Sequence, residues 1–411
     1  MGLLDTTNPA IGTMTIRVTN GSRAAEFTRF LDYSYRENYL EASDSLSFVL
    51  DQRELSKADA AVLQPGATVE PCIGGNVQSR GIIDEVSATF SRDEGNVVHV
   101  TARDWLSVAV DGQVDPQVRF VPSMSLLDLI VAAYSTINPN ITVVADAIAN
   151  RNVLTGRIYG QKTTKKGRPL KSIILGQEKP FPNEGLFTFT SRVAQRFGLW
   201  IRPYTDGETI VVAGPDYTQA ARYGICHAFD DRRIENNAIR GTFSRSRKDQ
   251  PSVIYASGFG GGGNFAKSRL RAGIVNPAVN ADNSKIFAAY KDVPIIATDP
   301  LTAAYPTLLD GAARPAFLYD PESHTQEQIE SFLRRELSVR VRKALTARYE
   351  IMGHMLNGQP IAVDSICSVV DQQPSAQWAG PLWVLARDYR KDPRGGSRTT
   401  MELLVPGALQ F

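Results

Sequence analysis

Residues 44 to 50 read Asp44-Ser45-Leu46-Ser47-Phe48-Val49-Leu50, so that Leu46, Phe48 and Leu50 stand at every second position. Successive side chains of a strand point to opposite faces, and this spacing predicts a strand with one buried face. The same alternation of apolar and polar residues returns in four further runs between turn residues, Met14 to Val18, Val69 to Ile73, Gly81 to Ala88 and Val97 to Ala102. We therefore expect residues 13–115 to form an antiparallel β-barrel or sandwich, with a short helix near Leu55 to Leu63.

The hydrophobic period changes from two to about 3.6 after residue 115. Leu126, Ile130 and Tyr134 fall on one helical face, and Ser123 or Ser125 can cap the start of this helix. A second helix is expected near Phe187 to Phe197, followed by a hairpin that turns at Asp206-Gly207. Residues 116–215 are therefore expected to form a compact α+β domain.

Strand patterns return in the last part of the chain, where they are interrupted. Residues 216–256 and 346–411 carry the strands expected of a second β-barrel that is split in sequence. Residues 257–322 are rich in Ala, Asn, Asp and Pro, and we expect them to form an irregular insertion. Residues 1–12 are expected to form an N-terminal arm. The overall expectation is a β-rich α+β protein with two antiparallel β-barrels joined by α+β elements.

Residues 323–347 predict the strongest helix of the chain, packed on the second barrel. Thr325 and Gln328 have the spacing of a capping box. One face of the helix is apolar, and the other should be solvated. The apolar face comprises Ile329, Phe332, Leu333, Leu337, Val341, Ala344 and Leu345, and the other face Glu330, Arg334, Arg335, Arg342 and Lys343.

The charge balance argues against a dedicated nucleic-acid binder. The 411 residues include 45 Lys and Arg against 43 Asp and Glu, which gives a net charge of +2. Because such binders need a strongly basic balance to displace phosphate counterions, any contact with nucleic acid should be local. Cys72, Cys226 and Cys367 are too widely spaced for a disulfide framework, and they fit assembly in a reducing compartment. No apolar run approaches the length of a membrane helix, so membrane insertion is not expected.

The most suggestive chemical motif is the glycine run Gly258-Phe259-Gly260-Gly261-Gly262-Gly263, which fits the dinucleotide-binding pattern after an apolar run. A functional version needs a helix that begins at the third glycine, and Asn264 to Arg271 has no apolar stripe. A hinge or tight turn explains the run better. We therefore expect no cofactor and assign no cofactor-binding residue.

Other candidate chemistry is equally sparse. A polar segment carries Lys162, Lys165, Lys166, Arg168 and Lys171, which could touch DNA or an acidic partner or form a plain solvated loop. The four histidines share no metal-ligand spacing, and no nucleophile motif is present. These histidines are His99, His227, His324 and His354. We therefore assign no catalytic and no metal-binding residue.

In the order of its elements, the chain resembles the baseplate hub proteins of contractile-tailed phages, the Mu-like and late-control protein D group. The resemblance spans most of the chain, although the insertion at 257–322 carries no family residues. It rests on Asp44 to Leu50, on Gly81 to Val86 with Val100 to Trp105, on Phe187 to Trp200, and on Leu382 to Tyr389 with Gly396 to Leu404.

The resemblance implies a non-enzymatic structural protein with two barrels related to the tail-tube fold. Three copies would form a ring that adapts the sixfold tail tube to the threefold spike and encloses the channel through which DNA leaves. The implied partners are the tail tube protein, the tail spike protein and other baseplate proteins, in a virion assembled in the host cytoplasm. A phage-derived injection device would look alike in sequence. The alternatives are a cell-wall-degrading or nucleotide-binding enzyme, or a carbohydrate-binding β module.

Overall fold

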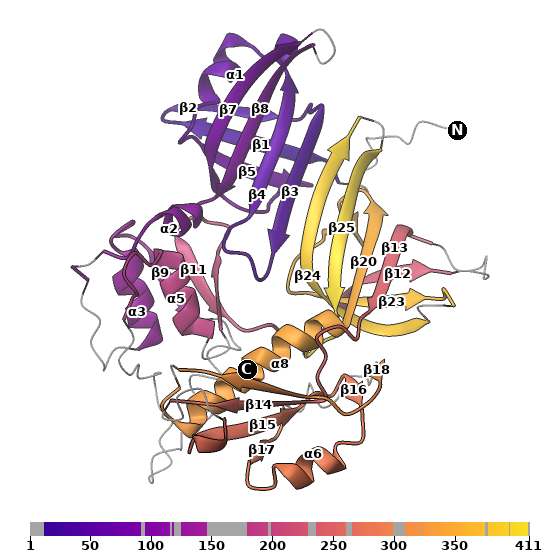
Figure 1. Ribbon diagram of the computed structural model, residues 1–411. Helices are drawn as coiled ribbons and strands as arrows, with labels where there is room; N and C mark the ends of the chain where they lie inside the picture. Colours follow the sequence, from indigo (N-terminus) through magenta and orange to yellow (C-terminus); the bar gives the residue numbers. More distant parts are fainter. Residues whose placement is uncertain are drawn as a thin grey trace.

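A computed structural model describes residues 12–91, 95–115, 117–118, 125–145, 179–195, 199–228, 236–259, 265–298, 309–321, 323–374, 377–393 and 395–409. These residues form one large sheet and two smaller αβ units beside it (Figure 1). Among the helices of these ranges, none combines the length and apolar composition that a membrane crossing requires.

The first half of the large sheet confirms the strands expected from the alternating runs. Its strands pair in the order β3-β4-β8-β7-β5-β1-β2, with β6 beside β5. Their bounds are β1 (Met14–Asn20), β2 (Arg23–Phe27), β3 (Asp32–Asn38), β4 (Ser45–Asp51), β5 (Thr68–Ile73), β6 (Asn76–Val77), β7 (Gly81–Ser91) and β8 (Gly95–Asp104). After the short 3-10 helix η1 (Gln52–Glu54), the expected helix is α1 (Lys57–Val62), capped by Ser56.

The second half of the large sheet is built from the two separated segments of the chain. Its strands pair in the order β13-β20-β25-β24-β23-β12. Their bounds are β12 (Ala221–His227), β13 (Ala238–Arg245), β20 (Leu345–Met352), β23 (Ile366–Asp371), β24 (Trp378–Asp392) and β25 (Gly396–Leu404), with a small hairpin of β21 (Met355–Leu356) and β22 (Gln359–Pro360).

The two halves are not separate closed barrels, so that part of the expected fold is not confirmed. In the first half β2 and β3 are the end strands, and β3 uses its outer edge to pair with β24 instead. In the second half β12 and β13 are the end strands, and no ladder joins them among the described residues. The chain is β-rich and its strands are largely antiparallel, as expected. The strands expected in two barrels form one continuous sheet instead.

The unit between the halves has the expected α+β composition. A three-stranded sheet of order β10-β11-β9 is covered by helices α3 and α5 (Figure 1). The elements are α2 (Ser107–Asp111), α3 (Leu126–Tyr134), β9 (Thr142–Ala145), α5 (Leu186–Gln195), β10 (Trp200–Pro203) and β11 (Thr209–Ala213). The cap of α3 is Ser125, whose hydroxyl accepts from the Asp128 backbone N–H.

The insertion expected to be irregular contains a second small sheet. Strand β14, which we expected in the second barrel, pairs with β15 and β19, and β17 completes the order β17-β15-β14-β19. The sequence pattern of this sheet is weak because its strands have two to five residues and pair with strands that are distant in the sequence. The elements are β14 (Val253–Ser257), η2 (Phe265–Lys267), β15 (Arg271–Val275), β16 (Val279–Asn280), α6 (Ser284–Ala289), β17 (Ile295–Ile296), β18 (Leu309–Asp310) and β19 (Pro315–Tyr319).

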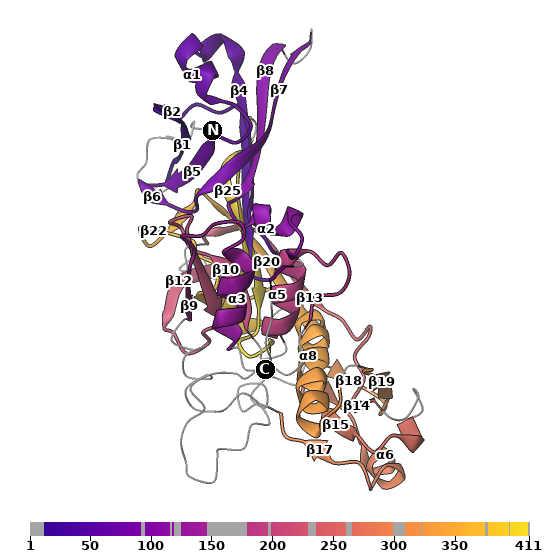
Figure 2. The same cartoon turned by 90° about the vertical axis from the view of Figure 1, so that its left-hand side faces the viewer.

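The long helix α8 (Gln326–Ala344) begins with the expected capping box of Thr325 and Gln328. It packs chiefly on β14 and β15, and only its end reaches β20 and β13, so its expected placement on the second barrel is corrected (Figure 2). The reason is the apolar face that the small sheet offers through Ile254, Ala272 and Ile274, all fully buried.

Two residues of α8 also differ from expectation. Arg334 is 7% exposed rather than solvated, and Phe332 is only half-buried. At the start of the helix, Ile329 packs against Gly258, where a Cβ would lie 2.8 Å from the Ile329 Cδ1 atom and 2.6 Å from the Ser323 carbonyl oxygen. The first residue of the glycine run is therefore required for packing.

The buried stripe of α8 makes a stability prediction. Leu337 is fully buried, so Leu337→Ala should cost about 2–5 kcal/mol through lost burial and the cavity left behind. Arg335, which lies over the Phe332 ring with its Cζ 5.4 Å from the ring centroid, is the matched control on the outer side. Arg335→Ala should stay within about 0.5 kcal/mol of the wild type in urea denaturation. Equally small effects of both substitutions would contradict the packing described.

Candidate functional site

The two halves of the large sheet meet where β24 changes partner. Residues Trp378 to Trp383 of β24 pair with β23, and residues Ala386 to Lys391 pair with β3 on the same edge. A register shift between Val384 and Ala386 accompanies this change. Because β24 serves both neighbours, its backbone hydrogen bonds fix the first half of the chain against the second.

A buried ion pair reinforces this junction. Arg387 of β24 is 4% exposed, and its Nη2 lies 2.7 Å from Oε2 of Glu37 on β3. The other oxygen of Glu37 accepts from Nη2 of Arg202 at 3.2 Å. Arg202 stands on β10, in the α+β unit. A single carboxylate therefore bridges the two halves of the sheet and the unit between them.

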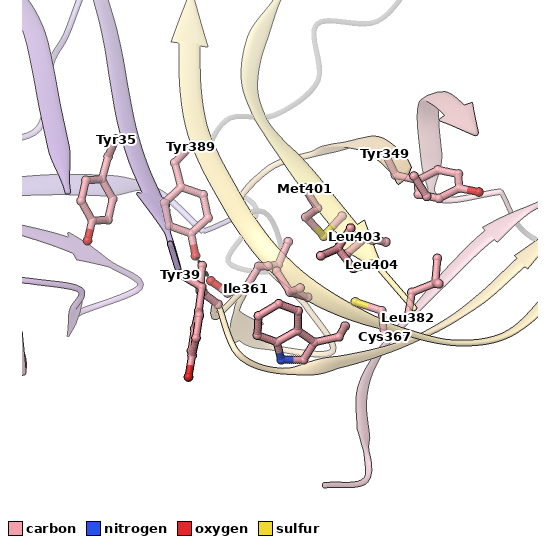
Figure 3. Close-up of a cluster of buried hydrophobic side chains, with 14 of the residues drawn as sticks. Tyr35, Tyr39, Tyr349, Ile361, Cys367, Leu382, Tyr389, Met401, Leu403 and Leu404 are labelled. Atoms are coloured by element: carbon pink, nitrogen blue, oxygen red, sulfur yellow. Dashed lines mark hydrogen bonds between the residues drawn. The ribbon is translucent and has the colours of Figure 1, made fainter. Parts of the chain in front are cut away.

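Arg387 makes further contacts through Nη1, whereas its Nε is buried without a hydrogen-bond partner among the described residues. Its Nη1 donates to the Gln78 Oε1 atom at 2.9 Å and to the backbone carbonyl of Ile361. Its guanidinium lies 4.6 Å from the Tyr389 ring centroid and 5.6 Å from that of Tyr35. Figure 3 shows these two tyrosines on neighbouring strands. Aromatic faces attract a cation most strongly where water is excluded, so these rings stabilise the buried charge.

Arg202 is held from a second side by Asp364, the residue that precedes β23 by two. The Arg202 Nη1 and Asp364 Oδ2 atoms are 3.5 Å apart. Asp364 also accepts from the indole N–H of Trp383 at 2.8 Å. The Arg202 guanidinium covers the Tyr39 ring at 4.7 Å from its centroid. The α+β unit is thus tied to both halves through one arginine.

Two further carboxyls lie beside Glu37 in a cavity of about 430 Å³. Asp44 accepts from the Tyr35 hydroxyl at 3.0 Å, and burial raises its pKa well above the usual value, with Glu37 and Asp104 adding to the shift. Burial also raises the pKa of Asp104 to about 6, although the carboxylate accepts from the backbone N–H groups of Asp44 and Leu106. The Ser43 hydroxyl also donates to Asp104 at 2.9 Å, so hydrogen bonds hold these carboxyls at a domain joint.

His354 forms a second buried joint between the halves. Thr399 donates its hydroxyl to the Gly353 carbonyl, so it accepts from Nδ1–H of His354 at 2.9 Å. The Nε2 atom then accepts from the Tyr33 hydroxyl at 2.5 Å. The ring is neutral in this arrangement, and burial lowers the pKa of His354 to about 3.

The inner and outer faces of the continuous sheet differ sharply in chemistry. Registered neighbours across seven strands form rows, because directly paired residues share a face. One inner row comprises Ala102, Leu46, Tyr35, Tyr389, Thr399, Ile351 and Ala238. The adjacent outer row comprises Arg103, Ser45, Arg36, Asp388, Thr400, Glu350 and Arg240.

The outer face is polar and its charges are partly paired. The Arg398 Nη1 atom lies 2.9 Å from the Glu350 Oε1 atom, and Arg390 forms an ion pair with Asp388. The Ser34 hydroxyl donates to Asp388 at 2.9 Å. The outer face of the strands from β7 to β13 is therefore a hydrophilic surface of balanced charge.

Among the described residues, the eight-stranded run β7-β8-β4-β3-β24-β25-β20-β13 has a strand edge at each end that is mostly without a ladder partner. β5 pairs with β7 only at Gly81 and Ile82, and β7 continues to Ser91 (Figure 2). Near its end Phe90 is 84% exposed. β13 is paired in a ladder only with β20 in the described part of the chain. Unpaired strand edges and an exposed aromatic ring are features of an interaction surface.

The candidates from the sequence are not gathered into a chemical site. Gly260–Gly263 and the basic segment with Lys162, Lys165, Lys166, Arg168 and Lys171 lie outside the described residues. His227 lies 3.2 Å from Asp371 and His324 contacts Phe259, while His99 stands on β8. No group of three metal-ligating side chains occurs in the ranges that the structure describes.

Sequence reasoning missed Glu37, Arg202 and Arg387, the residues of the junction. A signal was present, because Arg387 interrupts an apolar run that was correctly expected to be a strand. A charge at such a position needs a buried partner, but nothing in the sequence identifies which one.

Neither a scan against protein-family models nor a search of curated proteins finds a match. Solved structures do match over nearly the whole chain. The tail protein from Neisseria meningitidis MC58 has a TM-score of 0.67 and 18% identity, and the match covers 97% of this chain and 98% of that one. The 43 kDa tail protein of prophage MuSo2 from Shewanella oneidensis has a TM-score of 0.67 and 14% identity, covering 96% and 100%.

A third structure, the prophage tail protein gp18 from Listeria monocytogenes EGD-e, has a TM-score of 0.52 and 10% identity, and the match covers 95% of this chain and 94% of that one. These likenesses show that the chain has a fold found in phage tail proteins. The expected Mu-like and late-control protein D group is a finer assignment and stays a prediction.

The buried carboxylate predicts a large stability effect. Glu37→Gln leaves Arg387 buried without its counter-charge, and should cost about 3–5 kcal/mol in urea denaturation. Glu26→Gln is the matched control, because Glu26 pairs with Arg17 at 2.9 Å with both side chains about half exposed. That change should cost less than about 1 kcal/mol. A loss for Glu37→Gln no larger than the control would contradict the role of Glu37 as the bridging group.

The neutral imidazole predicts a pH dependence of stability. The pKa of His354 is about 3 when folded, below the usual value of 6.5. The stabilisation that the neutral ring provides is therefore fully present above pH 6.5. As the pH falls toward 3, the free energy of unfolding decreases by up to about 1.4 kcal/mol per pH unit. The raised pKa of Asp104 has the opposite effect, because protonation of this buried carboxyl below pH 6 increases the free energy of unfolding.

To isolate the histidine, the pH slope of the unfolding free energy is compared between wild type and His354→Gln. The variant should have the smaller acid loss, whereas His99→Gln, at a half-buried position, should follow the wild type. Parallel slopes for wild type and His354→Gln would show that His354 is not buried neutral.

Proposed function

We propose that this chain is a non-enzymatic structural protein of a phage tail. The observation that carries the proposal is the shared fold over almost the full length of two phage tail proteins, at TM-scores of 0.67. The internal chemistry supports it, because Asp44, Asp104 and His354, whose pKa values are shifted, are hydrogen-bonded at the joints between units. Rigid joints suit a component that must keep its shape within an assembly.

The finer proposal is a baseplate hub made of three copies. Each copy presents two β units side by side in one sheet, so three copies present six units around an axis. Such a ring adapts a sixfold tail tube to a threefold spike. The proposed bounds of the two β units are those inferred from the sequence, without residues 253–256, which lie in the small sheet.

The free edges give the ring a way to close. If β7 of one copy pairs with β13 of the next, three eight-stranded runs make a closed sheet of twenty-four strands. The polar outer rows then line the channel. Their balanced charge suits the passage of DNA, since a channel lined throughout by Lys and Arg would hold the phosphates.

The partners of such a hub are the tail tube protein, the tail spike protein and other baseplate proteins, in the baseplate of the virion. Assembly takes place in the host cytoplasm. The three cysteines support a reducing compartment, because each is a free thiol in the structure.

The oligomeric state tests the hub directly. Multi-angle light scattering should give about three times the chain mass of 45.0 kDa. A strictly monomeric species at high concentration, with the spike protein present, would count against the hub.

A variant at the free edge separates assembly from folding. Phe90 is 84% exposed in the single chain, so Phe90→Ser should leave its denaturation midpoint nearly unchanged and weaken the trimer by about 1.5–3 kcal/mol. Tyr204→Ser, at a side chain that is 56% exposed on the α+β unit, is the control and should leave the trimer intact. Equal effects of the two variants on trimer mass would place β7 outside the interface.

A further inference from the structure

Two basic runs of the same pattern lie far apart in the sequence. Arg245-Ser246-Arg247-Lys248 begins at the last residue of β13, and Arg340-Val341-Arg342-Lys343 lies in the last turns of α8. Each run has three cations in four residues. The whole chain has a net charge of only +2, so these runs concentrate positive charge locally.

The fold places the two runs side by side, where α8 leads into β20 (Figure 1). The Ser246 backbone N–H donates to the Ala344 carbonyl at 3.0 Å, which continues the ladder of β13 and β20. The Gln250 side-chain amide donates to the Arg340 carbonyl at 2.6 Å, and Arg340 donates to the Asp249 carbonyl at 3.3 Å. The two runs therefore form one surface, called here the basic cluster.

Four cations of the two runs lack an acidic neighbour in the part of the chain that the structure describes. Arg340 lies 3.7 Å from Glu336. Arg247, Lys248, Arg342 and Lys343 have no carboxylate within ion-pair distance in the residues that the structure describes. Lys248 and Lys343 are exposed, and Arg247 donates only to the Ala312 backbone carbonyl, at 3.4 Å. Exposed cations without an acidic neighbour favour an anionic ligand.

A structural role explains only part of the cluster. Arg342 and Lys343 lie in the last turn of α8, where cations are stabilised by the carbonyl end of the helix dipole. Arg247 and Lys248 lie on a connection outside any helix, so this explanation does not apply to them.

We propose that the basic cluster binds the phosphodiester backbone of nucleic acid without reading its sequence. Phosphate contacts need cations alone, whereas a protein partner also needs apolar or aromatic anchors. The Phe243 ring beside Arg245 is half-buried against Trp378, so Arg247, Lys248 and Lys343 supply exposed cations without an exposed aromatic anchor. The proposal goes beyond passive passage of DNA through a hub, and it does not depend on a trimer, because both runs belong to one chain.

The test is fluorescence anisotropy with a labelled 20-base-pair DNA duplex, titrated with the full chain over a range of salt concentrations. Neutralising Arg247, Lys248, Arg342 and Lys343 to Gln should weaken binding about tenfold or more and reduce the salt slope by about three. The control neutralises four exposed bases on the first half of the sheet, Arg23, Arg29, Arg53 and Lys57, and should keep the wild-type affinity.

Two results would overturn the proposal. One is equal loss in the cluster variant and the control, which would mean attraction to the whole surface. The other is competition by poly-glutamate as effective as by unlabelled duplex, which would indicate an acidic protein partner. Light scattering in the same buffer reports assembly separately, so failure of DNA binding and failure of the hub are distinguishable.

Discussion

The arrangement of the two halves of the sheet depends on the pairing of β3 with the second half of β24. It also depends on the buried ion pair between Glu37 and Arg387 of these two strands. β24 gives one edge first to β23 and then to β3, so two β units become one sheet. The side chain of Arg387 must be buried at this joint, and only a charged partner makes that burial tolerable. Glu37 also binds Arg202, and the α+β unit is held by the same carboxylate. The orientation of three parts of the chain thus follows from one buried group.

The burial of charged and polar groups at these joints also explains where shifted pKa values occur. Shifted pKa values often mark catalytic sites, but Asp44, Asp104 and His354 have theirs because they are buried at joints. Each has hydrogen-bond partners that belong to the scaffold. Polar groups that remain free to act are on the outside, in the rows that cross the continuous sheet and in the basic cluster. The proposed function therefore rests on surfaces and their arrangement.

Local patterns in the sequence were sufficient for elements whose signal is contained within a few residues. The alternation of Leu46, Phe48 and Leu50 gave β4, and the spacing of Thr325 and Gln328 gave the start of α8. Features that depend on distant partners could not be predicted this way. The small sheet around β14 has short strands. Helix α8 packs mainly on the apolar face of this sheet and not on the second β unit. Glu37 and Arg387 are 350 positions apart, and no local pattern indicates that β3 pairs with β24.

The central claim is that this continuous sheet, with its polar outer face and two free edges, closes with two further copies around a channel. A cryo-electron microscopy reconstruction of the purified assembly tests it most directly. The account predicts a threefold ring in which β7 of each copy lies beside β13 of the next, with Arg36, Asp388 and Thr400 facing the axis. A particle without an axial channel, or a ring with the inner row of Tyr35 and Tyr389 toward the axis, would contradict it.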